Sequence, residues 1–166
     1  IRDFGYQPIV TSAALAVALA ELSGTGVCGI GMHLGALRSE FSVVRHGQEL
    51  ARCEIPLGLA MPPKDSAEKQ PSPEDVLREI FATAAFELKR RPEWKSLATP
   101  IAMAIGGDAI EFAGCAEHIP TCIQHASWPF AVGKVCLASE PAWTVSRGCL
   151  IQAELESLTV AARPAA

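Results

Sequence analysis

The sequence of 166 residues is poor in aromatic residues and has no surplus of positive charge. Aromatic side chains make up 6% of it, so a core has to be built mainly from Ala, Val, Leu and Ile. The formal net charge of -4 argues against a nucleic-acid partner, because a binding face for nucleic acid needs a basic stripe. No apolar run reaches the roughly 18 residues of a membrane-spanning helix, so we expect no membrane insertion.

The six cysteines include no C-x-x-C pair. Most of them lie in apolar stretches, so we expect buried, reduced thiols in a cytoplasmic protein rather than disulfides. Cys115, His118, Cys122 and His125 follow the spacing C-x2-H-x3-C-x2-H, which raises the alternative of a zinc site. One straight helix would spread these four side chains over about 15 Å, so a half-buried helix face is the favoured interpretation and no metal is expected.

Hydrophobic residues make up 49% of the sequence and charged residues 19%, which is typical of one folded domain. Periodicity and turn residues predict helices and strands in the order helix, three strands, helix, strand, helix, strand, helix. The expected ranges are 13–22 (helix), 27–32, 40–44 and 49–55 (strands), 73–88 (helix), 101–105 (strand), 113–125 (helix), 132–137 (strand) and 143–158 (helix). The helix after Ser72 has the clearest pattern, with a cap, a proline at the first turn and one apolar face.

Two segments are expected to lie outside the packed helices and strands. Residues 56–73 contain five prolines around a charged centre, which predicts a mobile linker inside the domain. Residues 159–166 are expected to form a flexible tail. The chain begins with Ile1 instead of Met, which suggests a fragment or a processed product.

Several short motifs follow one another along the chain. They are VCGIG at 27–31, FSVVRHG at 41–47, IPLG at 55–58, IAMAIGGDA at 101–109 and PAWTVSRGCL at 141–150. In this order they resemble the second phosphate hairpin, the adenosine motif and the closing helix of the actin-like ATPase superfamily. The bacterial actin homologues of cell shape, cell division and pilus assembly are the members that the motifs resemble most.

The resemblance covers residues 1–158 and implies a single actin-like domain II, the C-terminal half of such a protein. The implied fold is α/β and ribonuclease-H-like, the actin-type three-layer fold. It has a mixed five-stranded sheet that contains an antiparallel three-strand meander, with helices on both faces. By resemblance, Gly29, Gly31, Gly106 and Gly107 would bind nucleotide. The alternative for these glycines is that they only shape tight turns.

The sequence departs from the family at a critical position. The acidic residue of the family's D-x-G motif falls on Gly29, which offers no carboxylate to magnesium-bound phosphates. We therefore expect no catalytic residue, no cofactor and no ATP hydrolysis for this chain alone; ATP and Mg²⁺ would belong to a full-length protein. A ribonuclease-H nuclease is disfavoured too, because Asp108 is an isolated carboxylate and two metal ions need several.

Two functions follow from the resemblance. The first is a degenerate, non-catalytic actin-like domain, an assembly or scaffold module of a bacterial cell-envelope, pilus, secretion or division machine. We expect it in the cytoplasm, where it would bind a protein partner or form a homo-oligomer. The alternative is the C-terminal half of a nucleotide-dependent actin-like ATPase or of a sugar-kinase-type enzyme.

Overall fold

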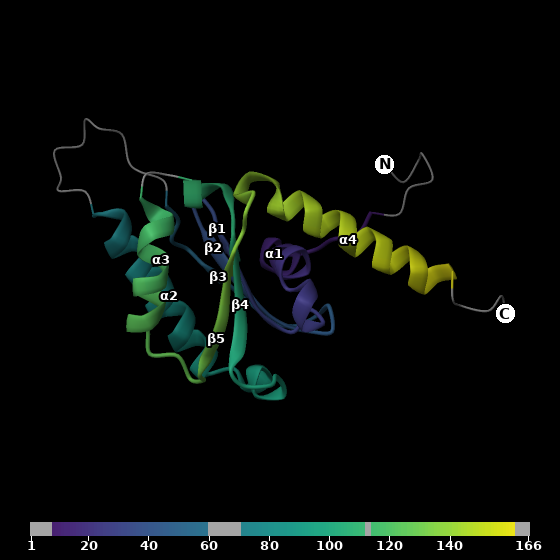
Figure 1. Ribbon diagram of the computed structural model, residues 1–166, viewed down its shortest axis with the longest axis horizontal. Coiled ribbons are helices and arrows are strands. Elements are labelled where there is room, and N and C mark those ends of the chain that lie inside the picture. Colours follow the sequence, from purple (N-terminus) through teal and green to yellow (C-terminus); the bar gives the residue numbers. More distant parts are fainter. Residues whose placement is uncertain (1–7, 60–70, 112–113, 162–166) are drawn as a thin grey trace.

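A five-stranded mixed sheet forms the middle layer of the molecule (Figure 1). The computed structural model describes residues 8–59, 71–111 and 114–161. The strands are β1 (Gly29–Leu34), β2 (Ser39–Arg45), β3 (Gln48–Ile55), β4 (Ile101–Gly106) and β5 (Val132–Leu137), in the spatial order β3-β2-β1-β4-β5. Strands β1, β2 and β3 are antiparallel neighbours, whereas β1, β4 and β5 are parallel. The predicted three-strand meander within a mixed sheet is confirmed.

Helices lie on both sides of the sheet (Figure 1). One face carries α2 (Pro73–Lys89) and α3 (Cys115–His125), and the other carries α1 (Ala13–Glu21) and α4 (Pro141–Ala161). The larger apolar core lies beneath α2 and α3 and includes Phe41 and Phe81. A smaller core lies beneath α1. The expected three-layer arrangement is therefore confirmed.

Helix α2 shows how the local sequence starts an element. The Ser72 hydroxyl accepts a hydrogen bond from the Asp75 backbone N–H, and the Asp75 carboxylate accepts one from the Ser72 N–H in return. This reciprocal pair satisfies two N–H groups that the first helical turn leaves without partners. Leu77 and Phe81 on the inner face are fully buried, as the periodicity predicted.

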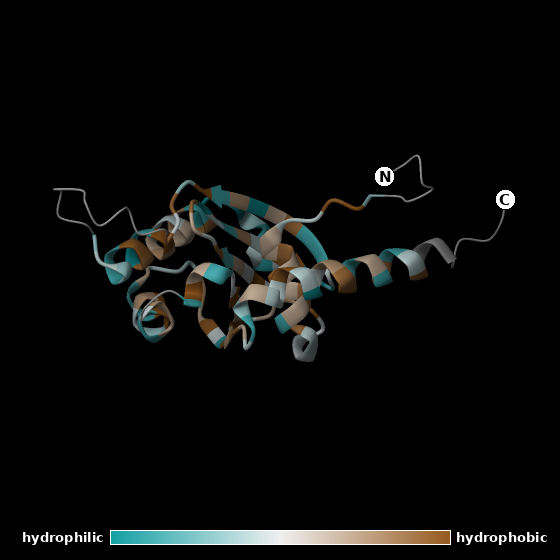
Figure 2. Ribbon diagram, turned by 90° about the horizontal axis from the view of Figure 1, so that it is seen from above, coloured by the Kyte–Doolittle hydropathy of each residue, from teal (hydrophilic) through white to brown (hydrophobic). Residues whose placement is uncertain are grey.

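Helix α1 lies between the sheet and α4, so residues 14–20 are all buried. Helix α1 can pack closely against both β1 and α4 because each of them presents a glycine to it. A Cβ added to Gly31 of β1 would lie 2.1 Å from the Ala14 oxygen, and one added to Gly148 of α4 would lie 1.9 Å from the Ala16 oxygen. The Ala-rich composition of α1 thus reflects its burial on both sides. Beyond α1, α4 extends away from the sheet (Figure 2).

Some boundaries differ from the predicted ones. Strand β1 begins and ends two residues later than expected, because Val27 has a positive φ of 52° and turns the chain before the strand starts. Helix α4 continues to Ala161, so residues 159–161 are helical instead of belonging to a tail. In the predicted linker, Leu59 is buried and its N–H donates to the Gly35 oxygen at 3.0 Å. Residues 60–70 of that linker and 162–166 of that tail lie outside the described residues.

Candidate functional site

The carboxyl ends of the parallel strands β1 and β4 meet at one edge of the sheet. His33 of β1 pairs in register with Gly106 of β4. After this point the chain turns from β1 to its antiparallel neighbour β2. The chain after β4 continues to β5, which lies on the opposite side of β4 from β1. Open α/β sheets bind ligands where neighbouring strands leave in opposite directions. A cleft of about 420 Å³ lies here, and we refer to it as the carboxyl-end cleft. Its lining comprises Thr11, Ser12, Ala13, His33, Gly35, Ala36, Leu37, Arg38, Glu40, Arg52, Glu54 and Asp108.

Of the four predicted nucleotide-binding glycines, Gly106 and Gly107 lie beside this cleft. Gly107 has a φ of 117°, and a Cβ there would lie 2.3 Å from the Leu34 oxygen. Glycine is required at position 107, because any side chain there would clash with the end of β1 where the chain turns after β4. Gly106 is the last residue of β4, and a Cβ there would lie 3.0 Å from Val17 of α1.

Gly29 and Gly31 lie elsewhere, in the first half of β1. A Cβ on Gly29 would lie 2.4 Å from the Ala102 oxygen of β4, and Gly31 faces α1. At about 3.3 Å per strand residue, Gly29 is about 13 Å from the end of β1 that lines the cleft. The structure therefore does not bring the four glycines together. The turn before β2 marks the carboxyl end of β1. A sequence analysis that used this turn to locate the end of the strand would have placed His33 and Gly35 at the cleft.

His33 lines the carboxyl-end cleft and lies between two glycines. A Cβ on Gly35 would lie 3.1 Å from its Cε1 atom, and one on Gly107 would lie 3.0 Å from its Cδ2 atom. Burial lowers the pKa of His33 below its ordinary value of 6.5, and the carboxylates of Asp108 and Glu40 oppose this effect. The imidazole is therefore kept neutral at pH 7. The sequence analysis did not select His33.

The N-terminus of α1 points into the same cleft, and the chain's own side chains bind it. Glu40 Oε2 accepts a hydrogen bond from the Ala13 N–H at 3.1 Å, and Ser12 Oγ accepts one from the Leu15 N–H at 3.0 Å. Glu49 Oε1 accepts a hydrogen bond from the Ser12 hydroxyl at 2.5 Å. A helix N-terminus attracts anions such as phosphate. Here the Glu40 carboxylate already occupies that position.

The cationic side chains of the cleft are paired as well. Arg52 forms an ion pair with Glu40, and Arg38 Nη1 lies 2.7 Å from Glu54 Oε1. Together with the Asp108 carboxylate, the lining of the cleft contains three carboxylates and two guanidinium groups. A triphosphate with Mg²⁺ needs unpaired donors and cations for its oxygens. The residues of the described cleft do not fit such a ligand.

The cysteines and histidines of α3 stay apart. Cys115 and Cys122 are buried, and burial raises the pKa of both thiols. His118 Nδ1 lies 3.6 Å from Glu74 Oε2 of α2. Within the described residues no three His, Cys, Asp or Glu side chains form a group that could hold a metal ion. All six cysteines are free thiols. The favoured interpretation of this stripe, a half-buried helix face, agrees with the structure.

The mixed five-stranded sheet with helices on both sides is the expected α/β fold, and at a coarse level it is actin-like. A search of solved structures finds the ethanolamine utilization protein EutJ from Carboxydothermus hydrogenoformans with a TM-score of 0.50 and 16% sequence identity. The similarity covers 85% of this chain and 54% of that one, so the chain spans about half the length of EutJ. No family model matches the sequence, and no curated protein matches it. At this identity the likeness shows the fold alone.

No helix in the described ranges combines the length and the apolar character that crossing a membrane requires.

Proposed function

We propose that this chain is a non-catalytic actin-like domain that serves as an assembly or scaffold module. By resemblance, its setting would be a bacterial cell-envelope, pilus, secretion or division machine, and its place the cytoplasm. The observation that carries the proposal is the Glu40 carboxylate at the N-terminus of α1. An acidic side chain that fills the anion position of the cleft, and is itself neutralised by Arg52, removes the need for a phosphate there.

Exposed apolar side chains on α4 support a protein partner or a second copy of the chain. Trp143 is 66% exposed and Leu150 is 62% exposed, and they lie seven residues apart. Two full turns of a helix separate such positions, so both side chains lie on one stripe. Large apolar residues that are exposed together mark interaction surfaces more often than isolated ones do.

A second candidate function rests on Gly107 and on the length of the chain. The glycine pair at the end of β4 stands where the resemblance places the adenosine motif, and Gly107 has the positive φ of a glycine turn. A chain that spans about half of EutJ would also suit the C-terminal half of a nucleotide-dependent ATPase or sugar-kinase-type enzyme. A D-x-G-x-[ST] phosphate loop upstream in the full gene product would favour this second candidate.

Calorimetry with Mg-ATP tests the proposed function. We expect no saturable heat of binding to this chain. The Glu40→Ala variant is the matched comparison, because it frees the Ala13 N–H and the Arg52 guanidinium. This variant should gain measurable binding of inorganic pyrophosphate. A micromolar dissociation constant of the unaltered chain for Mg-ATP would show that the assignment of a degenerate nucleotide site is wrong.

A further inference from the structure

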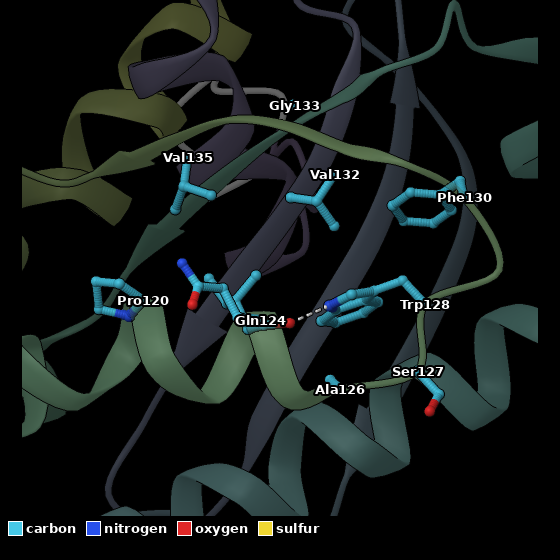
Figure 3. A pocket seen from close by; sticks show the side chains of 10 residues that line it. Pro120, Gln124, Ala126, Ser127, Trp128, Phe130, Val132, Gly133 and Val135 are labelled. Carbon is cyan, nitrogen blue, oxygen red and sulfur yellow. Dashed lines mark hydrogen bonds between the residues drawn. The ribbon is translucent and has the colours of Figure 1, made fainter.

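A second hollow lies between α3 and β5, beside the amino end of β5 (Figure 3). The carboxyl-end cleft lies at the other end of the parallel strands, so the two are separate. The second hollow has a volume of about 520 Å³, within the range of roughly 300–1,000 Å³ that is usual for small-molecule sites. In Figure 3, Pro120 and Gln124 of α3 form one wall and Val132 and Val135 of β5 form the other, with Trp128 at one end. We refer to it as the α3–β5 pocket.

An irregularity in β5 creates the apolar wall of this pocket. Ile101 and Met103 of β4 are two residues apart, yet they pair with Val132 and Val135, which are three apart. The additional residue of β5 makes a β-bulge or a similar irregularity, which we refer to as the bulge. In a regular strand, residues three apart point to opposite faces of the sheet. The bulge turns Val132 and Val135 to the same side, and both point towards α3 in Figure 3.

Trp128 is held rigidly at the end of the pocket. Its indole N–H donates to the Ile123 oxygen at 2.9 Å. Its ring stacks with Phe130 at a centroid distance of 6.0 Å and meets Phe81 edge-on at 6.2 Å. A flat aromatic surface that is fixed in advance costs little entropy when a ligand stacks on it.

The polar groups of the pocket are few and uncharged. The Trp128 N–H is already used, which leaves the side-chain amide of Gln124 as the polar group on the α3 wall. None of the ten lining residues carries a charge. A charged ligand would therefore lose hydration here without gaining an opposite charge. An amide can both donate and accept a hydrogen bond, so Gln124 suits a carbonyl or an amide group.

We propose that the α3–β5 pocket binds an uncharged, planar aromatic small molecule that carries an amide or carbonyl group. The ring lies between Trp128 and the two valines of β5, and the polar group pairs with the Gln124 amide. This site is independent of the proposed scaffold function, because it uses no residue of the carboxyl-end cleft or of α4.

Nuclear magnetic resonance with three matched probes tests the proposal. Benzamide is planar, uncharged and carries an amide; benzoate adds a charge, and cyclohexanecarboxamide removes the planarity. Benzamide should shift the Trp128 indole N–H signal and the Gln124 side-chain signals in a saturable way, at millimolar concentration or below. The other two probes should bind several-fold more weakly. No saturable shift with benzamide, or equal binding of benzoate, would overturn the proposal.

Two substitutions on exposed positions of α3 complete the test. Gln124→Ala should weaken benzamide binding by about 3- to 10-fold, the equivalent of one hydrogen bond. Thr121→Ala, an exposed position of the same helix outside the lining, should leave the affinity unchanged. Equal affinity in both variants, or shifts at His33 instead of Trp128, would show that benzamide does not use this pocket.

Discussion

The carboxylate of Glu40, in β2, accepts a hydrogen bond from the backbone N–H of Ala13, the first residue of α1, at 3.1 Å. The two residues are 27 positions apart, so the contact joins the meander to the helix that precedes it. The same carboxylate pairs with Arg52 of β3. The Glu40 side chain of β2 thus contacts both α1 and β3 at the carboxyl-end cleft.

Glu40→Ala should lower the free energy of unfolding by about 1–2 kcal/mol, because α1 loses a charged partner at its positive end. Glu40→Gln keeps an oxygen for the Ala13 N–H and should cost less than Glu40→Ala. Urea denaturation of both variants measures the difference. Equal losses would mean that the ion pair with Arg52, and not the hydrogen bond to α1, is what Glu40 contributes.

Gly148→Ala should lower the free energy of unfolding by about 1–3 kcal/mol, because the new methyl group would meet the backbone of α1. At a solvent-exposed position of a helix, Gly→Ala would raise the free energy of unfolding by about 1 kcal/mol. The loss expected here therefore has the opposite sign. Gly24→Ala is the control, since nothing lies within 4 Å of its Cβ position. Thermal melts check both variants, and a stabilised Gly148→Ala would contradict the close packing of α1 and α4.

Leu77→Asp or Phe81→Asp should unfold the domain. Both side chains are fully buried beneath α2, and an unpaired carboxylate there costs several kcal/mol, comparable to the roughly 5–15 kcal/mol that holds a domain together. Glu79→Ala, at an exposed position of the same helix, should change stability by about 0.5 kcal/mol or less. Urea melts of the three variants decide the matter. A Glu79→Ala variant as damaging as the other two would show that α2 presents a different face to the sheet.

Stability should fall as the pH drops below about 6.5, and His33 should account for part of the fall. Its pKa is lowered in the folded state, so the unfolded chain binds more protons below its ordinary pKa of 6.5. Linkage then makes unfolding easier as the pH decreases towards the lowered value. His33→Gln should flatten this pH dependence, whereas His125→Gln, at an exposed position, should not. Urea midpoints between pH 7.5 and 5 measure it; identical slopes for His33→Gln and the unaltered chain would contradict the assignment.

Much of the architecture could be predicted from local patterns. Strand β5 was predicted with its observed bounds, and the Ser72 cap of α2 was identified from the sequence. Caps and apolar periodicity act over a few residues, so a single sequence contains the information about them. The nucleotide assignment of Gly29 and Gly31 came instead from the resemblance to the second phosphate hairpin. Both glycines lie in the first half of β1, away from the cleft at its carboxyl end.

The sequence by itself determined the order of the elements, the capped start of α2 and the Ala-rich helix α1, because these depend on neighbours along the chain. Only the tertiary structure decided which side chains meet. It placed Glu40 at the N-terminus of α1 and His33 between Gly35 and Gly107. It also turned Val132 and Val135 to one side of β5 through a bulge. These relationships depend on register and packing between segments that are distant in sequence, and neither composition nor periodicity specifies a register.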